Sequence, residues 1–355
     1  MTRCVGLIAC VALGIGMASP AAALIFASPV SEPGTTLPKD FPYWEHVTQR
    51  RYNSPSVIYL GGGWALTARH VGMGEIFLEG EIYRPLAGSR RTLMNVDGSP
   101  ADAMVFALDP SQDLPEMPLL RLASQPPQPG EKILLIGFGR GRERVVEWDF
   151  EGERVYGFEW SSQGEKRWGT NRVTEVGKKI AQGSWHTQSI SFTFDPPLSA
   201  AATLHEAHAA VGDSGGAVFV ERESGWELTG LMTSVSGFSS TPKRTSTYGD
   251  VTFAAEIASY RGEILRWTRP ACGNELDDDG DRLADYPEDP GCDSRLDRDE
   301  RDSGSSGGDG ILALGAFAGA AALGFILWKR LRPKDETQAG VSSGAPWRDP
   351  SRSGD

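Results

Sequence analysis

The stretches WALTARH, residues 64–70, and GDSGG, residues 212–216, decide the fold and the chemistry of this chain. The first has the composition of a buried strand that ends at His70. In the second, Ser214 stands among glycines, which adopt backbone angles closed to other residues. A serine hydroxyl becomes a nucleophile when a base such as histidine takes its proton. The two stretches together predict a histidine-activated serine.

Short β-branched or aromatic runs surround these stretches and alternate with clusters of Gly, Pro, Asn and Asp. This spacing predicts an antiparallel barrel or sandwich. One helical pattern occurs, over 253–267, with apolar residues at intervals of three and four. The predicted strand segments are 56–60, 133–137, 189–194, 217–220 and 228–233.

An acid is needed to orient the histidine, and DLPEMPLLRL, residues 113–122, offers Asp113 before an apolar stretch. Asp109 competes for the same place. We prefer Asp113 because residues 113–122 resemble the aspartate motif of trypsin-like peptidases, in which an apolar strand such as 119–122 follows the acid at nearly this distance. The order His70, Asp113, Ser214 is that of chymotrypsin-type triads, and differs from the order in subtilisins and α/β-hydrolases.

On these three motifs, residues 41–269 resemble the trypsin/chymotrypsin-type serine peptidases. The resemblance implies an all-β domain over 24–270, built from two six-stranded antiparallel barrels with a C-terminal helix. It implies a serine endopeptidase without a cofactor for catalysis, acting on protein substrates. The oxyanion hole would be formed by the amides of Gly212 and Ser214.

The same resemblance places the substrate-binding residues. His208, six residues before the serine, falls at the base of the specificity pocket, unless a loop shift moves it out. Thr233, Ser234 and Val235 fall on a strand that pairs with an extended substrate, and Thr233 is expected to hydrogen-bond Asp113.

Activation in that family places a new N-terminus against the residue that corresponds to Asp213. No Ile-Val-Gly-Gly sequence follows a basic cleavage site here. Either Leu24 becomes the new N-terminus after removal of the leader and binds Asp213, or Asp213 has another partner. The cysteines that stabilise many family members are also absent, and Val71 stands where one is usual.

Two other classes of function stay open. A catalytically silent trypsin-like fold would serve as a surface binding or adhesion module. A serine esterase would place a helix straight after Ser214, whereas residues 217–220 have the composition of a strand.

The charge of the chain argues against nucleic-acid binding. The net charge is −12, and residues 272–302 hold thirteen acids against four arginines. The rest of the chain is close to neutral, so it offers no basic field for phosphates.

The N-terminus has the three parts of a secretory signal peptide, residues 1–23, with an Ala-x-Ala cleavage site. We therefore expect export. Two of the four cysteines lie in this leader, which leaves Cys272 and Cys292 to form a disulfide.

Residues 271–300 form an acidic module that resembles Asp-rich repeats of exported bacterial proteins. Six of its residues follow the spacing of a calcium loop, although Arg282 replaces the usual glycine. The alternative is a solvated acidic spacer. The predicted Ca²⁺ ligands are Asp277, Asp279, Asp281, Leu283, Asp285 and Glu288.

The C-terminus predicts a membrane segment. A Ser/Gly linker, 301–310, precedes eighteen uncharged residues, 311–328, and a tail, 329–355, that begins with basic residues. The segment resembles GlyGly-CTERM sorting signals, which a rhomboid-type protease removes, and a plain anchor is the alternative. Both alternatives predict a membrane-anchored protein with its catalytic domain extracytoplasmic, released if the segment is processed.

Overall fold

The computed structural model describes residues 23–28, 38–51, 55–183 and 185–301 of the 355-residue chain. These residues lie in one compact unit, which runs to Asp302. The predicted leader, apart from Ala23, falls outside the described residues. So do the linker beyond residue 301, the predicted span 311–328 and the tail.

The first main sheet comes from the N-terminal half of the chain and has seven antiparallel strands, in the order β6-β5-β2-β3-β4-β8-β7. β3, at the centre of this order, is buried along its whole length, because it has neighbours on both edges and apolar contacts on both faces. The strands are β2 (Val47–Arg50), β3 (Ser56–Gly61), β4 (Trp64–Thr67), β5 (Ile76–Leu78), β6 (Glu81–Tyr83), β7 (Arg91–Met94) and β8 (Pro100–Ala107).

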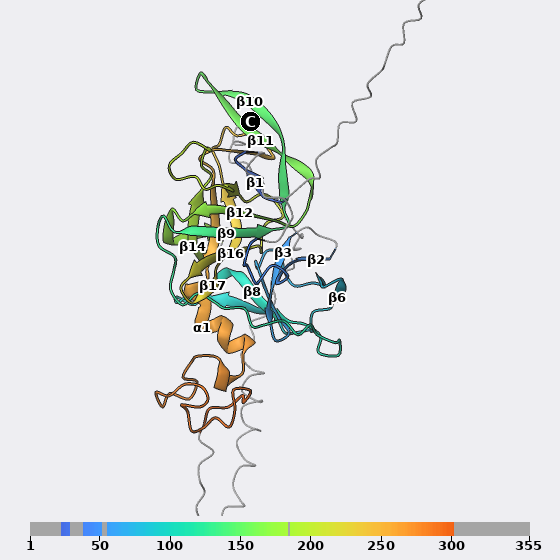
Figure 1. Ribbon diagram of the computed structural model, residues 1–355, viewed down its shortest axis with the longest axis vertical. Helices are drawn as coiled ribbons and strands as arrows, with labels where there is room; N and C mark the ends of the chain where they lie inside the picture. The colour runs from blue at the N-terminus through green and yellow to red at the C-terminus, as the bar shows by residue number, and fades with distance from the viewer. Residues whose placement is uncertain (1–22, 29–37, 52–54, 184, 302–355) are drawn as a thin grey trace, which may run out of the picture. The chain divides into compact units, whose positions relative to one another are not determined.

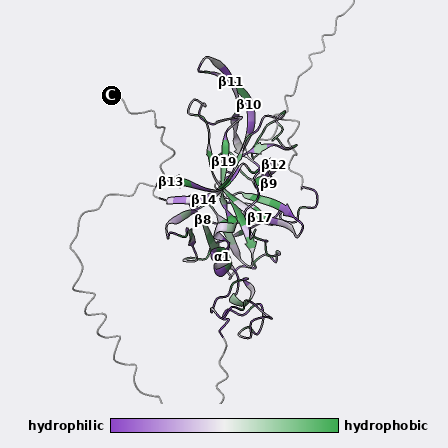
Figure 2. Cartoon of the chain, turned by 90° about the vertical axis from the view of Figure 1, so that its left-hand side faces the viewer, coloured by the Kyte–Doolittle hydropathy of each residue, from purple (hydrophilic) through white to green (hydrophobic). Residues whose placement is uncertain are grey.

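The second main sheet also has seven antiparallel strands, in the order β12-β9-β16-β17-β19-β14-β13. Figure 2 shows hydrophobic segments gathered in its inner strands, such as β9, β17 and β19. The strands are β9 (Lys132–Gly137), β12 (Arg167–Arg172), β13 (Glu175–Gln182), β14 (Trp185–Thr193), β16 (Ala217–Arg222), β17 (Gly225–Ser236) and β19 (Val251–Glu256).

Two smaller sheets flank the second main sheet. A ribbon of β10 (Arg140–Phe150) and β11 (Glu153–Gly164) pairs with β18 (Thr245–Thr247), and extends beyond the sheet (Figure 1). The short strand β1 (Ile25–Phe26) pairs with β15 (Ala207–His208). This second pairing brings the segment after Ala23 next to the loop that carries Ser214.

The two main sheets share one hydrophobic core. It holds Ile58 and Leu66 of the first sheet together with Ile136, Phe219 and Leu231 of the second, all fully buried. Burial of such side chains stabilises a fold by roughly 1.5–3 kcal/mol each. The core therefore fixes β4, which leads to His70, relative to β16, which follows Ser214.

The one α-helix among the described residues, α1 (Ile257–Thr268), follows β19 directly. The predicted helical pattern began at residue 253, but Val251–Glu256 form the strand β19. Tyr260 joins the sheets, because its hydroxyl donates to Asn95 Oδ1 and accepts the Gln188 N–H, each at 2.8 Å. A short 3₁₀ turn, η2 (Ala271–Gly273), leads into the acidic segment.

The mostly-β fold with a C-terminal helix is confirmed, but the expected six-stranded barrels are not seen. Each main sheet has seven strands, and its two outermost strands do not pair with one another among the described residues. The strand β13 is one of the strands that the sequence did not predict. Its sequence, EVGKKIAQ, is polar and largely exposed, so hydrophobic patterning did not mark it as a strand.

The predicted membrane-anchored location is corrected. In the part of the chain that the structure describes, no helix is both long and apolar enough to cross a bilayer.

Candidate functional site

His70 stands just beyond the end of β4, where buried residues give way to the surface. Its side chain is 41% exposed. The preceding residues Ala65, Leu66 and Ala68 are fully buried, and the Thr67 hydroxyl donates to Ser56 O at 2.9 Å. These contacts hold the end of the strand in place while the imidazole faces solvent.

Asp102, in β8, orients His70 through both of its carboxylate oxygens. Oδ2 lies 2.7 Å from His70 Nδ1, and Oδ1 accepts the backbone N–H of His70 at 2.9 Å. The Asp102 side chain is 1% exposed, and its own N–H donates to Thr187 Oγ1 across the two sheets. A buried carboxylate on Nδ1 favours the tautomer with a proton there, which leaves Nε2 as the base.

The predicted pairing of Asp113 with His70 is therefore wrong. Asp113 is exposed in the loop between β8 and β9. Its competitor Asp109 accepts hydrogen bonds from Ser111 and forms an ion pair with Arg84 at 3.4 Å. The sequence did hold a signal for Asp102, because it is the one acid inside the strand PADAMVFA, and a buried acid needs a partner.

Ser214 lies on a loop that backbone hydrogen bonds fix against both sheets. Its carbonyl oxygen accepts the N–H of Ser56, the first residue of β3, at 2.9 Å. The neighbouring Gly215 N–H donates to Met232 O in β17 at 2.8 Å. Since Ser56 also receives the Thr67 hydroxyl, the serine loop and the strand end that leads to His70 meet at one residue.

Two amides in this loop are available to bind an anion. Within the described residues, the N–H groups of Gly212 and Ser214 donate to no protein group. Gly212 has a φ of +99°, an angle that glycine adopts at little cost. The predicted oxyanion residues thus carry free donors beside the candidate nucleophile.

Replacing Gly215 by alanine is expected to abolish the reactivity of Ser214. The residue has a φ of +82°, and a Cβ would lie 2.0 Å from Ser56 O and 2.5 Å from Thr67 Oγ1. The serine loop must then move away from β3. The measurement is the rate at which a fluorophosphonate labels the protein. Gly88→Ala is the matched control, because Gly88 has a φ of +77° in open space, and it should keep normal labelling.

Asp213 is fully buried, and among the described residues only backbone N–H groups donate to its carboxylate. Oδ1 accepts the Gly139 N–H at 2.8 Å, Oδ2 accepts the Ala210 N–H at 2.9 Å, and the Leu24 N–H also donates to this carboxylate. Burial outweighs these hydrogen bonds and raises the pKa of Asp213 to about 7. The structure therefore brings Leu24 against Asp213, one residue after the predicted leader cleavage site.

His208 does not line an open pocket. Its ring stacks on Phe194, and its Nδ1 lies 2.9 Å from the Thr252 hydroxyl. The residue is 1% exposed, and burial lowers the pKa of His208 to about 3, so the ring is neutral. This position does not support the predicted place at the base of a specificity pocket, because pairing of β15 with β1 turns the side chain into the core.

The predicted substrate strand is the end of β17. Thr233 donates to Phe253 O at 3.3 Å, and not to Asp113 as expected, because it faces β19. Pairing with β16 stops at Leu231, whereas pairing with β19 continues to Ser236. Val235 is 38% exposed. In the described part of the chain, Ser234 and Val235 thus keep one strand edge without a neighbouring strand.

The acidic module is closed by a disulfide, as predicted. Cys272 and Cys292 are bonded, with their Cα atoms 5.7 Å apart. Three of the six predicted calcium ligands gather, because carboxylate oxygens of Asp277, Asp279 and Asp281 lie within 4.8 Å of one another.

The other three predicted ligands are spread out. Asp285 accepts the N–H groups of Asn274 and Glu275 instead, and Leu283 and Glu288 are exposed. Calcium binding by this set stays a prediction.

Comparisons with known proteins give weak similarities. No protein-family model and no curated protein matches the chain. Among solved structures, Rv3671c from M. tuberculosis H37Rv has 13% identity, with 63% of this chain and 87% of that chain covered, and a TM-score of 0.38. The NS6 protease of murine norovirus 1 has 17% identity, coverages of 62% and 94%, and a TM-score of 0.35. A mutant of human heparin binding protein has 14% identity, coverages of 65% and 92%, and a TM-score of 0.41. Because these TM-scores are below 0.5, the function of this chain is inferred from the geometry of its own residues.

Proposed function

We propose that this protein is a serine endopeptidase in which His70, Asp102 and Ser214 form the catalytic triad. The hydrogen bond between His70 Nδ1 and the buried Asp102 carboxylate carries the proposal. Burial of a carboxylate in an apolar strand costs free energy unless the group is paired. Here both carboxylate oxygens of Asp102 contact His70, and buried charged groups of this kind are common at functional sites.

The proposed reaction is acyl transfer in two steps. Ser214 Oγ attacks the scissile carbonyl carbon while His70 Nε2 takes its proton, and Asp102 stabilises the imidazolium that forms. The free amides of Gly212 and Ser214 stabilise the oxyanion. His70 then gives its proton to the leaving amine, and water hydrolyses the acyl-enzyme by the same path.

An extended peptide is the substrate that the site favours. The edge of β17 at Ser234 and Val235 offers backbone groups to which a peptide can pair as an added strand. The strand β16 begins at Ala217, directly after the GDSGG loop, as expected for a peptidase and not for an α/β-hydrolase esterase.

Hydrolysis of a labelled unfolded protein, such as fluorescent casein, tests this proposal. The purified chain should cleave internal peptide bonds, and Ser214→Ala should reduce the rate to background. Ser224→Ala, an exposed serine in the β16–β17 turn, is the matched control and should keep the full rate. Equal rates for wild type and Ser214→Ala would contradict the proposal and favour a silent binding module.

A further inference from the structure

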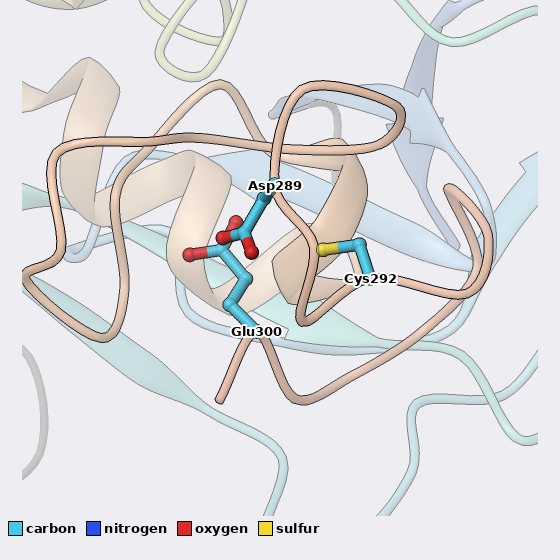
Figure 3. A group of neighbouring side chains, drawn as sticks. All are labelled: Asp289, Cys292 and Glu300. Carbon is cyan, nitrogen blue, oxygen red and sulfur yellow. The ribbon is translucent and has the colours of Figure 1, made fainter. Parts of the chain in front are cut away.

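Two buried carboxylates meet in the acidic module, apart from the exposed cluster at Asp277, Asp279 and Asp281. Asp289 and Glu300 are each 2% exposed, and oxygens of both lie within 4.8 Å of one another and of Cys292 Sγ. Figure 3 shows the two carboxylates turned toward each other. Because Cys292 is bonded to Cys272, its sulfur is not a thiolate ligand, and the two acids define the site.

One oxygen at this site is left without a partner. Asp289 Oδ1 accepts the Gly291 N–H at 2.7 Å, but the buried Asp289 Oδ2 has no hydrogen-bond partner. Glu300 is held by the N–H groups of Asp278 and Asp285, at 2.6 and 3.1 Å. These bonds hold both carboxylates in place, and the carboxylate that carries the unpartnered oxygen faces the neighbouring acid (Figure 3).

No basic side chain within the described residues forms an ion pair with either acid. The nearby arginines pair elsewhere: Arg261 and Arg269 with Glu275, and Arg266 with Asp278. Two adjacent buried carboxylates repel each other, and a shared proton or a cation between them removes that repulsion.

We propose that Asp289 and Glu300 bind one Ca²⁺ between them. Ca²⁺ takes six to eight hard oxygen ligands at about 2.3–2.6 Å and tolerates irregular geometry, which suits two carboxylates of a loop-rich segment. The site joins the end of the disulfide loop to the segment beyond it, so the ion would link residues that the disulfide alone does not connect. This proposal is independent of the peptidase activity.

Calorimetric titration of the chelator-treated whole chain with CaCl₂ tests the proposal, on a Ser214→Ala background to prevent self-digestion. We expect saturable binding with a Kd of about 1 mM or tighter. The isosteric pair Asp289→Asn and Glu300→Gln, made together, should weaken binding at least about tenfold, since it removes the charge without changing shape. Asp293→Asn, an exposed acid of the same module, is the control and should bind as the parent does.

A second variant and a thermal measurement separate the alternatives. Asp279→Asn should leave the affinity unchanged if the buried pair is the site, and should weaken it if the exposed cluster is. CaCl₂ should raise the melting temperature of the parent chain, a measurement that does not depend on the folding of any variant. Absence of binding up to about 10 mM would show that the acids share a proton, and unchanged binding in the double variant would place the ion elsewhere; either result overturns the proposal.

Discussion

Asp102→Asn is expected to lower kcat by about 10⁴-fold, whereas Asp113→Asn should leave it within about twofold. Asparagine keeps the shape of the buried side chain but can present an N–H to His70 Nδ1, which then loses its proton to Nε2. The imidazole can no longer accept the Ser214 proton. Asp113 is exposed and is not the acid that bonds His70, so loss of its charge should have little effect on the imidazole. The measurement is kcat on a fluorogenic peptide that the wild type cleaves.

The two variants control for each other, because each removes one carboxylate at constant volume. Far-UV circular dichroism should show that both fold, since Asp102 also accepts the His70 backbone N–H, which an amide oxygen can still accept. The reverse ranking of the two rates would contradict the assignment of Asp102 and restore Asp113.

The second large effect is expected at the N-terminus. A chain that begins at Leu24 should be at least about tenfold more active at pH 8 than one with a peptide joined to Leu24, because a free α-amino group can form an ion pair with Asp213. The same chain should be made with a removable tag ending directly before Leu24, and its kcat measured before and after tag removal.

The pH dependence of stability gives an independent readout of the same contact. In the tagged chain the pKa of Asp213 is raised to about 7. The contribution of this residue to the free energy of unfolding is therefore fully present below about pH 4 and is lost as the pH rises from about 4 to 7. A shift of this size corresponds to roughly 4 kcal/mol. After tag removal the ammonium group lowers the pKa of Asp213, so much of that loss should disappear.

Urea unfolding at pH 5 and pH 8 measures this difference between the tagged and untagged chains. Asp213→Asn is the control and should make the two chains respond alike to pH. Equal activity before and after tag removal, together with an unchanged pH dependence, would mean that Asp213 needs no ammonium partner.

The sequence predicted those parts of the site that local motifs carry. The stretch 64–70 fixes a strand end with a surface histidine, and 212–216 fixes a glycine-rich loop with a partly exposed serine, because backbone angles and burial are local properties. The sequence also predicted a helix near the end of the domain, the β-rich fold and the disulfide between Cys272 and Cys292.

The parts that sequence reasoning missed depend on contacts between distant elements. Asp102 reaches His70 because β8 pairs with β4, and no spacing along the chain reveals that register. His208 is turned into the core by pairing with Ile25, more than 180 residues earlier in the chain. The distance along the chain to the next apolar stretch favoured Asp113. The acid that contacts His70 is Asp102, which lies inside the strand β8.

Mapping of a fluorophosphonate adduct on the chain that begins at Leu24 directly tests the proposed triad. We predict one adduct per protein by intact mass, located at Ser214 by peptide mapping, and its complete loss in Ser214→Ala. A folded chain with a free Leu24 that takes up no label, or takes it up at another serine, would contradict the assignment of Ser214 as a nucleophile activated by His70 and Asp102.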